Sequence, residues 1–336
     1  MKKNTICFVA GRSGGHLIPA LTLVQQEKKK NTKTKVLFFS ANTKLDKKIA
    51  GKAKTIDWHI PLSLENIPGK KLHHYPRFFL DFFNSFFSAL HHLRTKKPNK
   101  IISTGGYITL PVACAAKLLK IPLHLYELNV VPGKTTKFLA PQAHEINICF
   151  DQTKKHLAGK KCVVTPYPNR FVNIKIQAPE TSFKKLNFCP TKKTILVLGG
   201  SQGSLSLNKC VGTWIANDHD LKNKIQIIHQ TGSLDKTDWI ETYKNLGVNA
   251  LVFDFCDNIQ DYYQIADLVI CRSGAGSLFE TFHFGKKCIT VPLETKKNNH
   301  QLYNAIGMQE MHPELFTVVR QKNRQKLFSK TLSDLL

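Results

Sequence analysis

The chain of 336 residues contains the same local pattern twice, and this repeat limits the possible folds more than any other feature of the sequence. Each copy consists of a short apolar run, a glycine cluster and an amphipathic segment. The copies occupy residues 5–10, 11–15 and 17–30, and residues 194–198, 199–203 and 205–215. A strand, a tight turn and a helix in this order open an α/β domain with a parallel sheet. We therefore expect two such domains.

Further strands are predicted from short runs that are almost continuously apolar, as parallel strands buried on both faces are. These runs lie at residues 35–40, 100–103, 122–126, 224–230, 251–255, 268–271 and 288–291. Helical periodicity follows most of them, so we predict two doubly wound, Rossmann-like domains. Pro166 and Pro168 resist both a helix and a central strand. We place the boundary there, with an N-terminal domain at residues 1–164 and a C-terminal domain at residues 165–336.

The net charge is strongly positive, because 49 lysines and arginines face 23 aspartates and glutamates, a formal balance of +26. Residues 1–150 hold 24 basic and 7 acidic side chains, whereas residues 151–336 hold 25 and 16. Such a surplus attracts nucleic acid, acidic lipid or a phosphorylated substrate. We expect this anionic partner to meet the first half of the chain.

Neither a membrane span nor a metal site is predicted. No apolar run approaches the roughly 20 residues that cross a bilayer, and the N-terminus lacks the apolar stretch and cleavage site of a signal peptide. The nine cysteines are scattered and never form a CxxC pair, which predicts reduced thiols in the cytosol. The one DxD string, at residues 218–220, is expected to be a loop that ends a helix. We predict no metal and no other cofactor.

Four glycine clusters, at residues 11–15, 105–106, 199–203 and 274–276, each follow a predicted strand. The carboxyl ends of strands carry the ligands of doubly wound folds, and the helix after a glycine turn offers N–H groups to a phosphate. The spacing matches neither Walker A nor GxGxxG, which disfavours kinase and nicotinamide chemistry. One cluster alone would equally suit a turn without a ligand. Four clusters predict two phosphorylated ligands.

Eight motifs in order resemble the signatures of the bacterial glycosyltransferase family that converts lipid I to lipid II in peptidoglycan synthesis. They read GRSGGHLIPA, STGGYITLP, YELNVVPGKTTKFLA, LGGSQGSLSLN, HQTG, FDFCDNI, ADLVICRSGAGSLFE and HQLYNA, from residue 11 to residue 305. The resemblance implies a GT-B architecture, with two Rossmann-like domains that face each other across a cleft. It also implies a UDP-N-acetylglucosamine donor in the second domain and the undecaprenyl-linked lipid I acceptor beside the first.

The resemblance also implies roles for individual residues. The donor site would comprise Asn129, Arg170, Ser201, Gln202, Cys256, Ala275, Gly276, Ser277, Glu280, His300 and Gln301. In it, Glu280 would hold the ribose and the backbone of Cys256 would meet the uracil, although Glu280 taken alone is more simply a solvated helix position. The acceptor diphosphate would meet Ser13, Gly14, Gly15, Gly105, Gly106 and Tyr107, with His16 on the same side.

The sequence departs from the family pattern at several positions. Arg12 stands where a glycine is usual, Leu128 replaces a glutamine, and Pro166 with Tyr167 replaces Gly-Asn. A side chain at Arg12 takes the place where backbone normally approaches phosphate, although its charge could itself bind one. The tail after Phe316 is short for the family, so we expect the final helix, which usually crosses back onto the first domain, to be reduced or absent.

Inverting transfer to a hydroxyl needs a base, and His16 is the best candidate by its pKa class and its place after the first glycine cluster. A ring that merely binds diphosphate is the alternative. The leaving UDP needs positive potential. The start of the helix near Ser277 would supply it, together with the side chain of Arg170. No carboxylate pair stands out, which disfavours the two-acid scheme of glycosidases.

Residues 69–98 predict an aromatic helix with basic ends. Phenylalanines recur every four residues, and we expect part of this surface to be buried and part to face lipid, with the lipid-facing rings among Phe78, Phe82 and Phe86. The alternative is that the whole phenylalanine face belongs to the core. The flanking cations that we assign to an anionic membrane surface are Lys70, Lys71, Lys96 and Lys97.

These observations predict an inverting N-acetylglucosaminyltransferase that forms lipid II and lies peripherally on the cytoplasmic face of the cell membrane. One alternative is a glycosyltransferase of the same architecture with another lipid acceptor, such as diacylglycerol. Another is a UDP-N-acetylglucosamine hydrolase or epimerase. A basic nucleic-acid-binding protein is disfavoured, because no recognition motif is visible.

Overall fold

The computed structural model describes residues 4–65, 68–69, 72–172, 174, 177–200, 203–218, 220–256, 258–295 and 299–320. It divides into two compact units, Met1–Arg170 and Phe171–Leu336. The division follows the proline-containing segment 165–170, which holds no helix or strand. The expected loss of a final helix concerns residues 321–336, which lie outside the described ranges.

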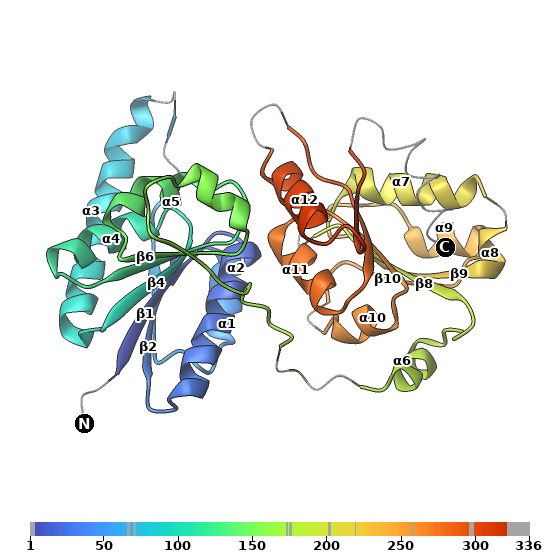
Figure 1. Ribbon diagram of the computed structural model, residues 1–336, viewed down its shortest axis with the longest axis horizontal. Coiled ribbons are helices and arrows are strands. Elements are labelled where there is room, and N and C mark those ends of the chain that lie inside the picture. Colours follow the sequence, from blue (N-terminus) through green and yellow to red (C-terminus); the bar gives the residue numbers. More distant parts are fainter. Residues whose placement is uncertain are drawn as a thin grey trace. The chain divides into compact units, whose positions relative to one another are not determined.

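The first unit is built on a parallel sheet with the strand order β3-β2-β1-β4-β5-β6-β7 among the described residues (Figure 1). The strands are β1 (Thr5–Ala10), β2 (Lys35–Ala41), β3 (Trp58–Leu62), β4 (Lys100–Gly105), β5 (Leu123–Glu127), β6 (Glu145–Ile148) and β7 (Cys162–Val164). The helices are α1 (Gly14–Lys30), α2 (Lys44–Gly51), α3 (Tyr75–Lys96), α4 (Thr109–Leu118) and α5 (Lys134–Leu139), with 3₁₀ turns at Leu72–His74, Ala140–Gln142 and Asp151–His156.

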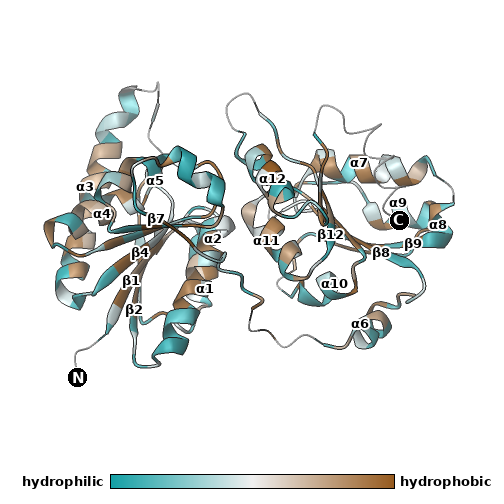
Figure 2. Ribbon diagram, viewed as in Figure 1, coloured by the Kyte–Doolittle hydropathy of each residue, from teal (hydrophilic) through white to brown (hydrophobic). Residues whose placement is uncertain are grey.

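Helices cover both faces of this sheet, which is why its central strands are largely apolar without polar alternation. Along β1, Cys7 and Val9 pack with the cluster that contains residues of α3 and α4, whereas Ile6 and Phe8 pack with residues of α1 and α2. Successive side chains of a strand point to opposite faces, so a run without polar alternation requires cover on both. Figure 2 shows the resulting hydrophobic centre of each unit.

The second unit repeats this plan with the parallel order β10-β9-β8-β11-β12-β13 among its described residues. The strands are β8 (Lys193–Leu198), β9 (Ile225–Gln230), β10 (Ala250–Phe253), β11 (Leu268–Cys271), β12 (Lys287–Thr290) and β13 (Phe316–Val318). The helices are α6 (Pro179–Leu186), α7 (Leu205–Ala216), α8 (Leu221–Lys224), α9 (Trp239–Asn245), α10 (Gln260–Ile265), α11 (Ala275–His283) and α12 (His300–Met311). The prediction of two Rossmann-like domains is confirmed.

The strand order reverses direction once in each sheet, between β1 and β4 and between β8 and β11. In doubly wound folds ligands bind beyond the carboxyl ends of strands at such switch points. The four glycine clusters of the sequence follow these four strands. The two sheets therefore place two pairs of glycine loops where ligands are expected.

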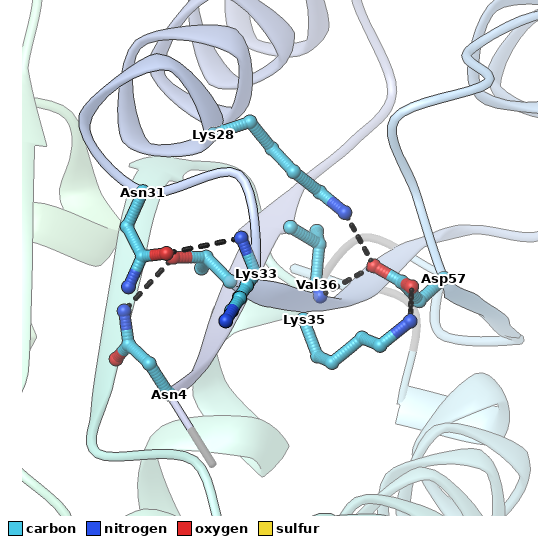
Figure 3. Close-up of polar contacts among 8 residues, drawn as sticks. Asn4, Lys28, Asn31, Lys33, Lys35, Val36 and Asp57 are labelled. Atoms are coloured by element: carbon cyan, nitrogen blue, oxygen red, sulfur yellow. Dashed lines mark hydrogen bonds and ion pairs between the residues drawn. The ribbon is translucent and has the colours of Figure 1, made fainter. Parts of the chain in front are cut away.

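The amino ends of the first sheet are occupied by structural ion pairs. Asp57 accepts hydrogen bonds from Lys28 at 2.7 Å, from Lys35 at 2.8 Å and from the backbone amide of Val36 at 2.9 Å (Figure 3). Burial alone would raise the pKa of Asp57, but these bonds outweigh it and hold the pKa below its ordinary value. These contacts give that end of the sheet a role in stability.

Candidate active site

A buried carboxylate holds the first glycine loop. Asp46, at the start of α2, is fully buried and accepts hydrogen bonds at 2.9 Å from the backbone amides of Arg12 and Ala41 and from the hydroxyl of Thr43. Arg12 has a left-handed backbone, with φ of 69°. The loop therefore turns at Arg12, and the Arg12 amide is directed to Asp46.

His16 lies in the first turn of α1 against the end of β4. Its Nδ1 is 2.7 Å from the carbonyl oxygen of Thr104, and the Thr104 hydroxyl donates to the His16 carbonyl at 2.8 Å. A carbonyl only accepts, so Nδ1 carries the proton and Nε2 of the neutral ring keeps a lone pair. A Cβ on Gly105 would lie 2.9 Å from Cε1 of His16, so the imidazole occupies the space that this glycine leaves.

The six residues expected around the acceptor diphosphate gather at the same switch point. Ser13 is the N-cap of α1, Gly14 and Gly15 open the helix, Gly105 ends β4, and Gly106 and Tyr107 follow it. The two loops touch, since a Cβ on Gly106 would lie 3.1 Å from the carbonyl oxygen of Gly11. Gly106 has a φ of 97°, which also favours glycine. Backbone amides at a helix start and a half-buried imidazole thus share one site.

The carboxyl end of β5 adds a second buried carboxylate that the sequence did not single out. Glu127 is 4% exposed and accepts from the Asn129 amide and side chain, both at 3.1 Å, and from the Gly133 amide at 3.0 Å. Burial and then Glu127 raise the pKa of the Cys149 thiol well above its ordinary value. Asn129 and Arg170 belong to the first unit, although the resemblance assigns both to the donor.

The second switch point pairs the glycines after β8 with the start of α11. Gly203 has a φ of 79° and sits directly on the carbonyl of Thr231, where any Cβ would clash. Ala275, Gly276 and Ser277 form the first turn of α11, with Gly274 as the N-cap. Ser201 and Gln202, the donor candidates in the loop after β8, lie outside the described residues.

The other donor candidates of the second unit lie on α11, after β10 and at the start of α12. Glu280 is on α11, with the Tyr263 hydroxyl 3.5 Å from its carboxylate. Cys256 follows β10 and is half-buried. Burial first, and Cys256 next, raise the pKa of Tyr262 to about 12. His300 is the first residue of α12. The next residue, Gln301, accepts a hydrogen bond at 2.9 Å from the backbone amide of Leu293.

Sequence reasoning missed Arg272, the residue between β11 and the N-cap of α11. Its guanidinium is almost fully buried and donates to the hydroxyls of Ser204 and Ser206 and to the carbonyls of Val291 and Pro292. An arginine at the end of an apolar strand, before Ser-Gly, was the available signal. Arginine rarely follows a buried strand unless its donors are used there.

The HQTG motif forms a buried polar network beside the same loops. His229 Nδ1 is 2.7 Å from the Tyr243 hydroxyl and Nε2 is 3.1 Å from Oδ1 of Asn208, whose amide group donates to Thr231 and Asp235. Burial lowers the pKa of His229 to about 3. Burial would raise the pKa of Asp235, but hydrogen bonds led by that from Asn208 lower it to about 2. The network is fixed in one protonation state near neutral pH.

The aromatic helix α3 presents a different face from the one expected. The rings packed partly against the core are Phe78, Phe82 and Phe86. The exposed rings are Phe79, Phe83 and Phe87, at 52%, 53% and 61%. Our assignment was wrong by one position, because adjacent phenylalanines define two aromatic faces. The buried residues Ser85, Ala89 and Leu93 select the face that meets the core.

The basic residues at the ends of α3 differ in availability. Lys96 makes a cation–π contact with Trp58, with Nζ 4.3 Å from the ring centroid, so its ammonium group is already engaged within the protein. Lys97 ends the helix and is exposed. The other two expected cations, Lys70 and Lys71, lie outside the described residues. Within the described ranges, no helix is long and apolar enough to cross a bilayer.

Among the described residues, no three histidine, cysteine, aspartate or glutamate side chains come close enough together to hold a metal ion. Asp218 and Asp220 of the DxD string lie in the turn between α7 and α8.

Comparison with known proteins matches both units to one family. Residues 6–148 match the glycosyltransferase family 28 N-terminal domain, and residues 194–335 match the glycosyltransferase family 28 C-terminal domain. A relative from Thermodesulfovibrio yellowstonii is 31% identical over 89% of this chain and 81% of its own length. It is named UDP-N-acetylglucosamine–N-acetylmuramyl-(pentapeptide) pyrophosphoryl-undecaprenol N-acetylglucosamine transferase.

Solved structures agree with this fold. A crystal structure of Acinetobacter baumannii MurG has a TM-score of 0.73 at 23% identity and covers 99% of this chain and 90% of its own. A UDP-GlcNAc 2-epimerase from Neisseria meningitidis, bound to UDP-GlcNAc, has a TM-score of 0.60 at 14% identity and covers 98% of this chain and 100% of its own. At these identities the likeness concerns the fold alone, which transferases and epimerases share.

Proposed function

Because the chain belongs to glycosyltransferase family 28, we propose that it transfers N-acetylglucosamine from UDP-N-acetylglucosamine to the C4 hydroxyl of the muramoyl sugar of lipid I, forming lipid II. One observation carries this proposal beyond the family. The two switch points carry different groups: an imidazole whose Nδ1 lies against the Thr104 carbonyl, so that Nε2 is the nitrogen left to accept a proton, in the first unit, and a glycine-led helix start in the second. A base and a diphosphate cradle are what an inverting transfer requires.

In the proposed reaction the C4 hydroxyl of the acceptor attacks C1 of the donor sugar. His16 Nε2 takes the hydroxyl proton as the C–O bond forms, while Thr104 keeps Nδ1–H in place and shares the growing charge of the ring. The bond between C1 and the diphosphate oxygen breaks, and UDP leaves with the electron pair. The amides of the first turn of α11 stabilise that charge, because unpaired N–H groups and the helix dipole both favour an anion there.

The proposal is tested by supplying labelled UDP-N-acetylglucosamine with lipid I, with diacylglycerol, or with no acceptor. We expect labelled product with lipid I alone. Product on diacylglycerol would identify a different lipid transferase. Turnover of the donor without any acceptor, to free sugar or to an epimer, would identify a hydrolase or an epimerase and refute the transfer.

We further propose that the outer face of α3 contacts an anionic membrane on the cytoplasmic side, where a lipid-linked acceptor is reached. Phe79, Phe83 and Phe87 follow one another at four-residue spacing and are more than half exposed. Leu80 beside them is 65% exposed, and Arg77, Arg94 and Lys97 are exposed toward the ends of the helix. An aromatic face with basic ends suits an interface, where each basic residue contributes about 1 kcal/mol.

Adjacent phenylalanines offer a matched pair of variants for this surface. Phe83→Ser removes an exposed ring and is expected to weaken sedimentation with anionic vesicles at an unchanged melting temperature. Phe82→Ser removes a core-packed ring and is expected to lower the melting temperature instead. Each ring that enters lipid contributes about 1.5 to 3 kcal/mol. If both variants retain full vesicle binding when folded, the membrane proposal for α3 is wrong.

A further inference from the structure

Arg272 uses its guanidinium to join three segments of the second unit. Nε donates to the hydroxyl of Ser204 at 2.9 Å, Nη2 donates to the hydroxyl of Ser206, and Nη1 donates to the carbonyls of Val291 at 2.9 Å and Pro292 at 3.4 Å. The residue is 6% exposed. Its five N–H donors have fixed directions in one plane, so this set of contacts defines the relative positions of the segments.

The three segments follow three neighbouring strands. Ser204 is the N-cap of α7 and follows the glycine loop after β8, Val291 follows β12, and Arg272 itself lies between β11 and α11. The order β8-β11-β12 makes these strand ends adjacent. The segment after β12 also continues the chain of contacts, because the Leu293 amide donates to Gln301. Arg272 thus shortly precedes the expected donor residues of α11 and contacts the segment that leads to Leu293, whose amide donates to the expected donor residue Gln301.

The chemistry of the contacts separates acceptors from donors. The guanidinium donates hydrogen bonds to hydroxyl and carbonyl oxygens, whose lone pairs would repel an incoming diphosphate if they were turned toward it. The backbone amides of the first turn of α11 are donors, so they do not bond to the guanidinium and can bond to a phosphate. We infer that Arg272 is a positioning residue that holds the loops after β8, β11 and β12 in the arrangement that binds a nucleoside diphosphate. This inference rests on the proposed function, since it concerns the site assigned there to the donor.

The test compares UDP binding by calorimetry in the whole protein and three variants. Arg272→Lys keeps the charge and loses the planar donors, and we expect the dissociation constant of UDP to rise about 10- to 100-fold, as when bonds from a charged group are lost. Ser206→Ala removes one acceptor only and is expected to raise it about 2- to 10-fold. In both, the KM for the donor should rise while the KM for lipid I and the turnover at saturating donor change little.

Gln226→Met is the matched control for a merely structural role. Gln226 is fully buried in β9 and bonds to Cys189 and Thr194 at 2.8 to 2.9 Å, at the amino ends of the strands. We expect it to lower the melting temperature and leave UDP affinity unchanged. If Ser206→Ala and a folded Arg272→Lys bind UDP as the unaltered protein does, the positioning role is wrong. If the unaltered protein binds neither UDP nor UDP-N-acetylglucosamine, the proposed function itself fails.

Discussion

The two switch points are built alike in backbone and differently in the charge that holds them. In the first unit the buried group beneath the glycine loop is the carboxylate of Asp46, which accepts from the backbone amide of Arg12 in the loop and from that of Ala41 at the end of β2. In the second unit it is the guanidinium of Arg272, which donates to hydroxyls and carbonyls. A buried anion occupies N–H groups, whereas a buried cation occupies oxygens and leaves N–H groups for other partners.

This difference matches the chemistry proposed for each unit. A diphosphate is bound best by free amides at a helix start, and the cation-held loops of the second unit provide that arrangement. The first unit commits one loop amide to Asp46 and contributes an oriented imidazole instead. The same fold thus supports nucleotide binding in one unit and proton transfer in the other.

Removal of the His16 imidazole is expected to give the largest loss of turnover and to leave nucleotide binding by the second unit unchanged. His16→Ala should lower turnover on lipid I by about 10²- to 10⁴-fold, while calorimetry finds the UDP affinity near normal. Thr104→Val is the matched control, because it removes the hydroxyl that bonds to the His16 backbone and keeps the carbonyl that holds Nδ1. Intact saturated turnover with a raised KM for lipid I would instead make His16 a diphosphate ligand.

The converse effect is expected from the carboxylate of α11. Glu280→Ala should raise the donor KM by about 10- to 100-fold, as expected for a hydrogen bond to a charged group, with a smaller effect on turnover, because a ribose contact is shared by ground and transition states. Tyr263→Phe removes only the hydroxyl 3.5 Å from this carboxylate and should have a smaller effect. An unchanged donor KM in Glu280→Ala would exclude the ribose role.

Acid is expected to destabilise the second unit through His229. Its pKa is about 3 in the folded protein and near 6.5 when unfolded, so the unfolded state binds more protons below pH 6.5. Stability therefore falls as the pH drops from about 6.5 toward 3, by up to about 1.4 kcal/mol for each pH unit. Asp235, with a pKa of about 2 in the folded protein, loses its contribution to stability only as the pH falls below about 4 toward 2.

Tryptophan fluorescence in a denaturant series checks this pH dependence. Trp239 has its ring centroid 5.3 Å from that of His229, whereas Trp58 lies in the first unit. A Trp58→Phe background leaves the reporters of the second unit, Trp214 and Trp239. Equal midpoints of unfolding at pH 7 and pH 5 would show that the buried histidine does not titrate as described.

The smallest expected effect comes from the residue that departs from the family pattern. Arg12→Gly removes about 1 to 2 kcal/mol of strain from the left-handed backbone conformation. It also lowers the free energy of unfolding by about 0.4 to 1 kcal/mol, because glycine raises the conformational entropy of the unfolded chain. We expect a net gain in stability between about 0 and 1.6 kcal/mol, measured by urea unfolding. If the guanidinium also binds the acceptor, the same variant raises the KM for lipid I. A loss of stability would mean that the side chain contributes more than the strain it imposes.

Much of the fold follows from local pattern, because the central strands are apolar on both faces and helices follow them. The missed strands β3, β6, β7 and β13 are short or carry polar residues such as His59 and Asn147. Their position is decided by pairing with a neighbouring strand, which composition does not report. The glycine clusters predicted the site for the same local reason, since each cluster directly follows a strand.

The features that escaped prediction depend on contacts between distant segments. Asp46 reaches Arg12 from 34 residues away, and Arg272 reaches Ser204 from 68 residues away. Asp46 does not differ in sequence from an ordinary helix charge, and the signal at Arg272 is its place directly after an apolar strand. The face of α3 escaped for a related reason, because only the packing of Ala89 and Leu93 distinguishes two adjacent aromatic rows.

We propose that the nucleotide binds to the cation-held loops of the second unit and not to the carboxylate-held loop of the first. Hydrogen exchange measured by mass spectrometry with and without saturating UDP tests it directly, because bound amides exchange more slowly. We predict slower exchange in peptides that cover residues 199–206 and 272–280, and unchanged exchange in peptides that cover residues 11–17 and 103–107. Slower exchange in the peptides of the first unit alone would contradict the account.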